Sequence, residues 1–421
     1  MAEAEPDFFS DPALIAEPRG YFDAMRARCP VAREAYHGTM MVTGHAEVID
    51  VLTRKDDFSS AIAVIGPIPP LPFEPVGDDV TDQIEAHRDE LPWSAHLVSF
   101  DGKKHADHRT LLTNLLTHKR LRQNEEYLRN LADRLIDGFI AKGRCNVVPE
   151  YGHATTTYAI SDLMGIPEAD RAELLELIGA PPSQIDGDAV HKIGPDPLIF
   201  MKERFDQYLH DRLEHPRDDL LSELIHSRFK DGSAPDFDVV SGLARFLFGA
   251  GQDTTSRLIA MGILHLGDDA DLQARLRREP GRIPDFLEEV LRYDAPVKVA
   301  YRIARRSTTV GGVDVPAGTI MTLCLTAASN DPRQFENPAR FDIDRSNLRN
   351  HLGFSRGAHG CPGAPLGRME ARIAIERILA RTTEIRISEE HHGPADSRRY
   401  RYEPTYSFRS LSDLYIEFTP V

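Results

Sequence analysis

The chain has 421 residues, of which 41% are hydrophobic, and its formal net charge is −16. This acidity disfavours nonspecific nucleic-acid binding, because a phosphate backbone requires a basic surface. No run approaches the roughly 18 apolar residues of a membrane span, and the acidic start lacks the basic residues of a secretory signal, so we expect a cytoplasmic protein without a membrane span.

The cysteines lie far apart and form no Cys-x-x-Cys pair: they are Cys29, Cys145, Cys324 and Cys361. This spacing argues against zinc ribbons and iron–sulfur clusters, and it suits a reducing compartment. No low-complexity tract, internal repeat or Gly/Ser-rich linker divides the chain, so we expect one domain over residues 1–421. Within it we expect a β-rich first part with a variable substrate loop (1–100), a helical part (101–300), and a last part (301–421) with a β segment, the Cys361 loop and a C-terminal β region.

Short β segments and one helix are predicted near the start. Residues 31–33 and 40–43 flank His37-Gly38, which indicates a hairpin, and residues 47–52 read as a short amphipathic helix. Residues 61–76 contain five prolines and are too broken for regular structure. This stretch could form one wall of a pocket or be an ordinary surface connection.

Helical periodicity dominates the rest of the chain. It extends from about residue 104 to 240, with breaks at 179–182 and 194–197, and returns at 364–379. Residues 308–325 form a second β region, with turns at Gly311-Gly312 and Pro316-Ala317-Gly318. The pattern predicts a mainly α protein with small β-sheets.

The longest predicted helix, residues 238–266, has no proline and is apolar on nearly every side. It should be a buried helix about 40 Å long. Its middle reads Ala-Gly-Gln-Asp-Thr-Thr over residues 250–255, and an acid and an alcohol are costly there unless they are partnered or used. Asp253 and Thr254 are therefore candidate catalytic residues beside room for a substrate or dioxygen. The alternative is a kinked helix whose polar groups are satisfied internally.

Cys361 lies in a glycine-rich loop, Phe354 to Gly363, just before the helical pattern at 364–379. At such a position the helix dipole and unpaired backbone N–H groups favour a thiolate, and the glycines allow the close approach of a flat, bulky group. A thiolate axial ligand suits haem iron that cleaves O–O bonds. The alternative is a small buried cysteine with no function.

Two charged pairs have helical spacing. Glu289 and Arg292 stand at i, i+3, and His105 and Arg109 stand at i, i+4. Each pair alone could be an ordinary surface pair of little energetic weight.

Taken in order, these strings resemble the cytochrome P450 family. The Cys361 loop matches Phe-x-x-Gly-x-His-x-Cys-x-Gly at every fixed position, although Gly367 stands where alanine is more usual. The strings His-x-x-x-Arg, Ala-Gly-x-Asp-Thr-Thr, Glu-x-x-Arg and the Pro-x-Arg-Phe element at Pro338–Phe341 also match. The resemblance covers about residue 100 to the end of the helix after Cys361.

The resemblance implies the cytochrome P450 fold, with haem b buried between the long central helix and the Cys361 loop. It implies that Cys361 ligates the iron, that Thr254 supports oxygen activation by hydrogen bonding, and that Asp253 relays protons. The implied haem-binding residues are His105, Arg109, Arg302, His359, Phe354, Gly357 and Gly363, of which the first four would face the propionates. The implied substrate contacts are Phe246, Gly249, Ala250, Val297, Val299 and Phe408. The implied structural triad behind the haem is Glu289, Arg292 and Arg340.

The implied activity is monooxygenation of a small or medium hydrophobic substrate, such as a terpenoid or an aromatic, with O2 as co-substrate. No flavin, nicotinamide or iron–sulfur signature is fused to the chain, so we expect an external ferredoxin, with NAD(P)H acting only through a ferredoxin reductase. We expect a monomer. A peroxygenase or coupling enzyme, and a noncatalytic haem sensor, are the alternatives.

Two charge features bear on the partners. Lys298 could indicate a carboxylate substrate, although alternation in an extended segment would turn it away from Val297 and Val299. Basic residues in segments expected behind the haem suggest a dock for an acidic electron carrier: Lys103, Lys104, Lys119, Arg120, Arg356, Arg368 and Arg372.

Overall fold

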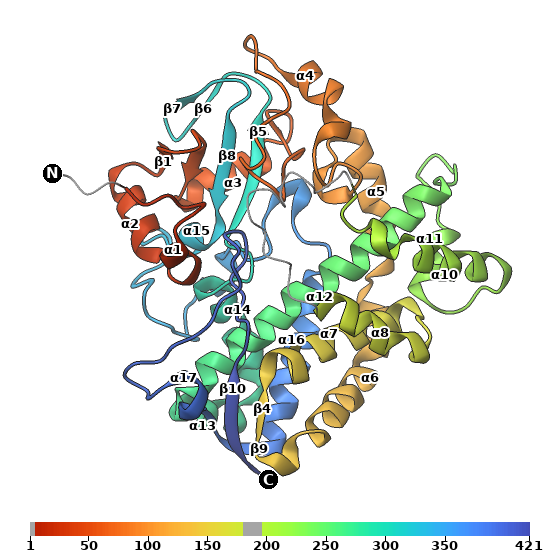
Figure 1. Ribbon diagram of the computed structural model, residues 1–421, viewed down its shortest axis with the longest axis vertical. Helices are drawn as coiled ribbons and strands as arrows, with labels where there is room; N and C mark the ends of the chain where they lie inside the picture. Colours follow the sequence, from red (N-terminus) through yellow and green to blue (C-terminus); the bar gives the residue numbers. More distant parts are fainter. Residues whose placement is uncertain (1–4, 180–195) are drawn as a thin grey trace.

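A computed structural model describes residues 5–179 and 196–421 of the chain. Its longest helix, α12 (Phe237–Gly267), crosses the middle of the molecule, with other helices packed along it (Figure 1). Buried side chains occur along its whole length, from Val240 to Leu266, as expected for a helix that is apolar on most faces. The predicted buried helix over residues 238–266 is confirmed.

Three helices of the main core pack against α12, namely α7 (Ala154–Met164), α14 (Ile283–Tyr293) and α16 (Ala364–Arg381), and α6 (His118–Asp137) packs in turn on α7 and α16. Their apolar side chains form the main core with those of α12. The remaining helices are α1 (Pro12–Ala16), α2 (Arg19–Arg28), α3 (His45–Thr53), α4 (Thr81–Ala86), α5 (Gly102–Leu115), α8 (Glu168–Gly179), α10 (Lys202–Glu214), α11 (Leu220–Ile225), α13 (Ala270–Arg278), α15 (Leu325–Ser329) and α17 (Glu389–His392). Most of the predicted breaks at 179–182 and 194–197 lie outside the described residues, and Asp196 and Pro197 precede α10 without being helical.

The largest sheet has five strands in the order β1-β2-β8-β5-β3. The strands are β1 (Val31–Arg33), β2 (Met40–Val42), β3 (Phe58–Ser59), β5 (Val299–Ala304) and β8 (Ile320–Cys324). β1 and β2 form the predicted hairpin, with Val31 opposite Val42, while β2 and β8 are parallel. Figure 1 shows this sheet beside α1, α2 and α3, on the side of the molecule opposite α8, α10 and α11.

Two smaller sheets complete the fold. β4 (Arg144–Asn146), β10 (Tyr415–Pro420) and β9 (Thr382–Ile387) pair in that order, and β6 (Thr308–Val310) pairs with β7 (Val313–Val315). The predicted β region at 308–325 is thus divided among β6, β7 and β8. The mainly α architecture with small sheets is confirmed.

The first 100 residues are not β-rich, contrary to the expectation. Helices α1 to α4 cover more of this part than the short strands β1, β2 and β3 do. The strands there are brief: β1 and β3 are the two edges of the sheet and β2 lies between β1 and β8, whereas the longer strands β5 and β8 come from residues beyond 298. The proline-rich stretch 61–76 contains no helix or strand, as predicted.

Candidate active site

An apolar cavity of about 320 Å³ lies between α12 and the loop that precedes α16. This volume is within the usual range for small-molecule sites. Segments far apart in the sequence supply its walls, including Ala63 and Val64 of the proline-rich stretch. That stretch therefore forms part of a pocket wall and is not only a surface connection.

Cys361 faces this cavity from the turn that leads into α16. The turn is held by a hydrogen bond from the Cys361 amide to the Phe354 carbonyl (2.9 Å). Burial raises the pKa of the Cys361 thiol, whereas the backbone amides of Gly363 and Ala364 and the charge of Arg109 lower it. Those amides at the start of a helix stabilise the thiolate, which is the form that binds a metal.

The other cysteines lie in different surroundings. Cys145 and Cys324 are buried, and burial raises the pKa of both thiols. Cys29 is half-buried at the end of α2. Cys361 alone among the cysteines lines the cavity, which disfavours the interpretation of Cys361 as a small packing residue.

Basic side chains gather at one edge of the cavity. The rings of His105 and His359 stack with their centroids 3.8 Å apart, and His359 Nε2 lies 3.0 Å from Ser60 Oγ. His105 Nε2 is buried without a hydrogen-bond partner among the described residues. The Arg302 guanidinium donates to the Tyr301 carbonyl (2.6 Å), and within the described parts of the chain it makes no ion pair with a carboxylate.

Burial disfavours the charged forms of these groups, so both imidazoles are neutral at neutral pH while Arg302 keeps its charge. Burial, followed by the neighbouring Arg302, lowers the pKa of His359 to about 2, and burial with the charge of Arg109 lowers that of His105 to about 4. Burial also lowers the pKa of Arg302 to about 10. A ligand that brings carboxylates would supply the missing negative charge, so this edge is built for an anionic group.

Asp253 and Thr254 point in different directions from α12. Thr254 lines the cavity, and its Oγ1 donates to the Ala250 carbonyl one turn earlier (3.2 Å). The Asp253 carboxylate instead pairs with Arg257, with an Nε–Oδ1 distance of 2.9 Å and an Nη2–Oδ2 distance of 2.6 Å. Arg257 Nη2 also lies 3.1 Å from Glu403 Oε2. The acid and the alcohol are therefore neighbours in sequence, one outside and one inside the cavity.

Comparisons with known proteins agree on one family. A family model described as Cytochrome P450 matches residues 190–384. Cyclomarin C epoxidase CymV of Salinispora arenicola is 30% identical over 304 residues, which cover 71% of this chain and 76% of that protein. The solved structure of Mycobacterium marinum cytochrome P450 CYP150A6 in its substrate-free form is 45% identical, with a TM-score of 0.92 and 99% of both chains covered. The chain belongs to the cytochrome P450 family.

Cytochromes P450 contain haem b and use O2, and the residues of this cavity fit that group. A thiol faces the cavity, and among the described residues Arg302 makes no ion pair with a carboxylate and the buried Nε2 of His105 has no hydrogen-bond partner. Phe354 and Gly363 line the cavity as the resemblance implied. Gly357 has another reason to be glycine: its φ is +73° and a Cβ there would lie 2.3 Å from the Leu52 carbonyl oxygen at the end of α3.

Most of the predicted substrate contacts of this P450 line the cavity. Phe246, Ala250, Val297, Val299 and Phe408 do so. Gly249 does not, because α12 turns that position towards the segment before α10, where a Cβ would contact Leu198 at 3.6 Å. The prediction that Gly249 lines the cavity was wrong, although the next residue on α12, Ala250, does line it.

Lys298 turns away from the cavity, as alternation in an extended segment predicted. It is fully buried, and its Nζ donates to the carbonyls of Ile15 (3.0 Å) and Thr405 (3.1 Å). Burial lowers its pKa to about 7. Lys298 therefore joins the first helix of the chain to the C-terminal region and does not indicate a carboxylate substrate.

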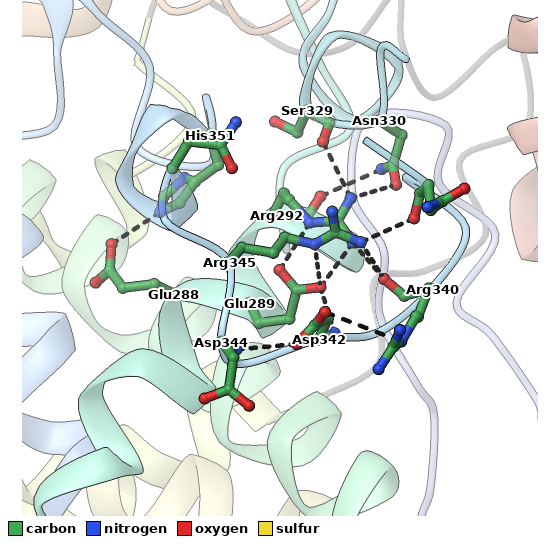
Figure 2. Close-up of polar contacts among 12 residues, drawn as sticks. Glu288, Glu289, Arg292, Ser329, Asn330, Arg340, Asp342, Asp344, Arg345 and His351 are labelled. Carbon is green, nitrogen blue, oxygen red and sulfur yellow. Dashed lines mark hydrogen bonds and ion pairs between the residues drawn. The ribbon is translucent and has the colours of Figure 1, made fainter. Parts of the chain in front are cut away.

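Behind the cavity, Glu289 and Arg292 form a fully buried ion pair on α14, with an Nε–Oε2 distance of 2.7 Å (Figure 2). Arg292 also donates to Asn330 Oδ1 (2.9 Å) and to the Ser329 carbonyl (3.3 Å). The interpretation of this pair as an exposed surface contact is thereby excluded. We refer to Glu289, Arg292 and their partners as the Glu289 network.

The third arginine of the network is Arg345, not the predicted Arg340. Arg345 Nε lies 3.2 Å from Glu289 Oε1, and its side chain is only 7% exposed. The Arg340 side chain is 74% exposed, and only its backbone carbonyl takes part, accepting from Arg292 and Arg345 (Figure 2). The chain between the two arginines turns after Phe341, which brings the later one back to α14.

Several functional contacts were not visible in the sequence. The residues concerned are ordinary charged ones: Arg257, Glu403 and Arg345. The partners of Glu403 and Arg345 lie far from them in the sequence. Arg257 follows Asp253 by four residues on a helix, so helical spacing could have identified this pair.

Within the described residues no helix is both long and apolar enough to cross a bilayer.

Proposed function

We propose that this P450 inserts one oxygen atom from O2 into a small or medium hydrophobic substrate, with electrons from an external ferredoxin system. The observation that supports it most is the placement of Thr254 on the cavity wall beside Asp253, which is held in an ion cluster outside. When bound, haem b supplies the reduction and activation of O2 at its iron.

The chain's own residues would hold that group from two sides. Cys361 Sγ would bind the haem iron, because it is the thiol that faces the cavity and its neighbouring amides favour the thiolate. Arg302, His359, His105 and Arg109 are the proposed partners of the propionates. A bidentate guanidinium suits a carboxylate, and such pairing would restore the charge balance of this buried edge.

Protons would reach the cavity through α12. The Asp253 side chain is 34% exposed, so its carboxylate is accessible to solvent while Arg257 holds it in place. The Thr254 hydroxyl can pass its proton into the cavity and accept another, since its present acceptor is only the Ala250 carbonyl. Replacement of Glu403 would change how Arg257 is shared between the two carboxylates.

The cavity favours apolar substrates. Phe246, Val297, Val299 and Phe408 offer no charge, and the Phe408 ring is backed by the Arg257 guanidinium, 4.7 Å from its centroid. Terpenoids and aromatics fit such a lining. The candidate substrates can be screened by the shift of the haem Soret band as a compound displaces water.

Thr254→Ala tests the proposed proton path. With a substrate identified by the Soret screen, we expect product per NAD(P)H to fall by about tenfold while NAD(P)H oxidation continues, because a lost proton donor costs roughly 10²–10⁴ in the step that it serves. The measurement is product and peroxide formed per NAD(P)H in a ferredoxin and ferredoxin reductase system. Thr254→Ser, which keeps the hydroxyl, is the matched control and should stay coupled. Turnover with peroxide alone, unaffected by Thr254→Ala, would contradict the proposal and favour a peroxygenase.

Fewer basic residues are free to form the proposed electron-carrier dock than the sequence suggested. Arg120, Arg368 and Arg372 are engaged by Glu223, Glu288 and Glu376. Lys104, Lys119 and Arg356 are exposed, and among the described residues none of them pairs with a carboxylate. These three cations are the proposed contact for an acidic ferredoxin.

Reversing two of these charges, Lys104→Glu with Arg356→Glu, should slow ferredoxin-supported reduction by about tenfold at low ionic strength, because steering by complementary charge accelerates association by about 10–10³. Stopped-flow reduction under carbon monoxide would measure the rate. Arg386→Glu, an exposed charge on β9, is the control. An unchanged rate in the double variant at low salt would rule out this dock.

A further inference from the structure

Three segments that come from different parts of the sequence meet in a buried ion network above the cavity. They are the segment before α5, which carries His96, the segment before α10, which carries Asp196, and α12, which carries Arg245. Asp196 Oδ1 lies 2.8 Å from His96 Nε2, and Asp196 Oδ2 lies 2.6 Å from Arg245 Nη1. One carboxylate thus holds two partners, one through each oxygen.

This network is well shielded from water. The side chains of His96 and Arg245 are 1% and 4% exposed, and that of Asp196 is 20% exposed. Water screens the attraction between these side chains only weakly, because they are buried. The loss of any one of the three would leave the others as buried polar groups with fewer partners. His96 Nδ1 and Arg245 Nε already lack hydrogen-bond partners among the described residues, so the Asp196 carboxylate is the anchor for both side chains.

Each anchored segment also supplies or adjoins the cavity wall. Phe246 follows Arg245 on α12 and lines the cavity, and the His96 ring stacks on it with centroids 5.8 Å apart and planes at 26°. Val98, two residues after His96, is another lining residue. Leu198, two residues after Asp196, packs on the outer face of α12 at Gly249.

We propose that His96, Asp196 and Arg245 are positioning residues that fix Phe246 and Val98 and so determine the size of substrate the cavity accepts. This inference deepens the proposed monooxygenase function and rests on it. The Asp196 carboxylate holds the His96 imidazole, which packs against the Phe246 ring. The Arg245 guanidinium fixes the same carboxylate to the turn of α12 that carries Phe246. None of the three is proposed to touch the reacting atoms.

The test uses two haem-ligating probes of different size, imidazole and 4-phenylimidazole, at mildly alkaline pH where both are uncharged. Asp196→Asn removes the anchoring charge from both partners. We expect the Kd of 4-phenylimidazole, read from the Soret band of the haem-loaded protein, to rise by about tenfold, in keeping with the loss of a hydrogen bond to a charged group. The Kd of imidazole, which is too small to need the Phe246 wall, should change by less than about twofold.

Asp206→Asn is the matched control. Asp206 of α10 accepts a hydrogen bond from Lys202 Nζ of the same helix (2.6 Å) and one from Ser241 Oγ of α12 (2.5 Å), and neither partner lines the cavity. That variant should bind both probes as the parent protein does. If Asp196→Asn fails to fold, His96→Phe serves instead, because it keeps an apolar ring against Phe246 and loses only the bond to Asp196.

Equal Kd values for 4-phenylimidazole in the parent and in both variants would overturn the proposal, and so would an equal loss for both probes. The reduced carbon monoxide spectrum separates this result from a failure of the proposed function. A variant that keeps the red-shifted band but loses size discrimination supports the inference, whereas a parent protein without that band refutes the haem-thiolate site itself.

Discussion

Cys361→His is expected to abolish the red-shifted absorption of the reduced carbon monoxide complex, and with it all monooxygenase activity. The band depends on a thiolate ligand to the haem iron, and an imidazole, which is a neutral ligand, would not push electron density towards the iron in the same way. The purified variant would be reduced with dithionite under carbon monoxide and its difference spectrum recorded, together with its haem content.

Cys29→Ser provides the matched control, since this cysteine is half-buried and lies at the end of α2, away from the cavity. It should retain both the band and the haem content. A surviving red-shifted band in Cys361→His would show that the ligand had been assigned to the wrong residue. Loss of the band in Cys29→Ser as well would indicate general damage and not ligand loss.

Arg292→Ala is expected to lower the free energy of unfolding by about 3–5 kcal/mol, because it leaves the Glu289 carboxylate buried without its main counter-charge. Both side chains of the pair are fully buried. Urea unfolding followed by circular dichroism would give the change, and the yield of folded protein would show whether the variant survives expression.

The comparison of Arg345→Ala with Arg340→Ala identifies the third member of the Glu289 network. Arg345→Ala should destabilise by more than about 1 kcal/mol, since it removes a buried donor to Glu289. Arg340→Ala should stay within about 0.5 kcal/mol of the parent, because its side chain is exposed and its carbonyl remains. The opposite order of effects would restore the sequence-based assignment.

The Cys361 loop and the centre of α12 were predictable because their chemistry is local. A cysteine before a helix and an acid–alcohol pair in an apolar helix place their groups by backbone geometry alone, so Cys361 and Thr254 face the cavity as expected. The strand pair β1–β2 and the bounds of α12 followed for the same reason.

Contacts between distant segments could not be predicted in that way. Whether Arg340 or Arg345 reaches Glu289 depends on how the chain turns after Phe341, and nothing in the four residues between the two arginines encodes that turn by itself. The error at Gly249 has a similar origin, because the side of α12 that faces the cavity is set by tertiary packing, and Gly249 lies instead next to Leu198. The partners of His96, roughly one hundred residues or more away, depend entirely on the tertiary fold.

The Glu289 network has a consequence for the protein without haem. It binds α14 to the chain that leads into the Cys361 loop. Next to it, His351 Nε2 lies 3.0 Å from Glu288 Oε2, and the same carboxylate pairs with Arg368 of α16. The Leu352 amide also donates to Ser329 Oγ (2.9 Å). All of these contacts are made by protein groups alone. The loop that carries Cys361 is therefore held at both ends by contacts that do not involve the haem, and we expect these contacts to persist when haem is lost.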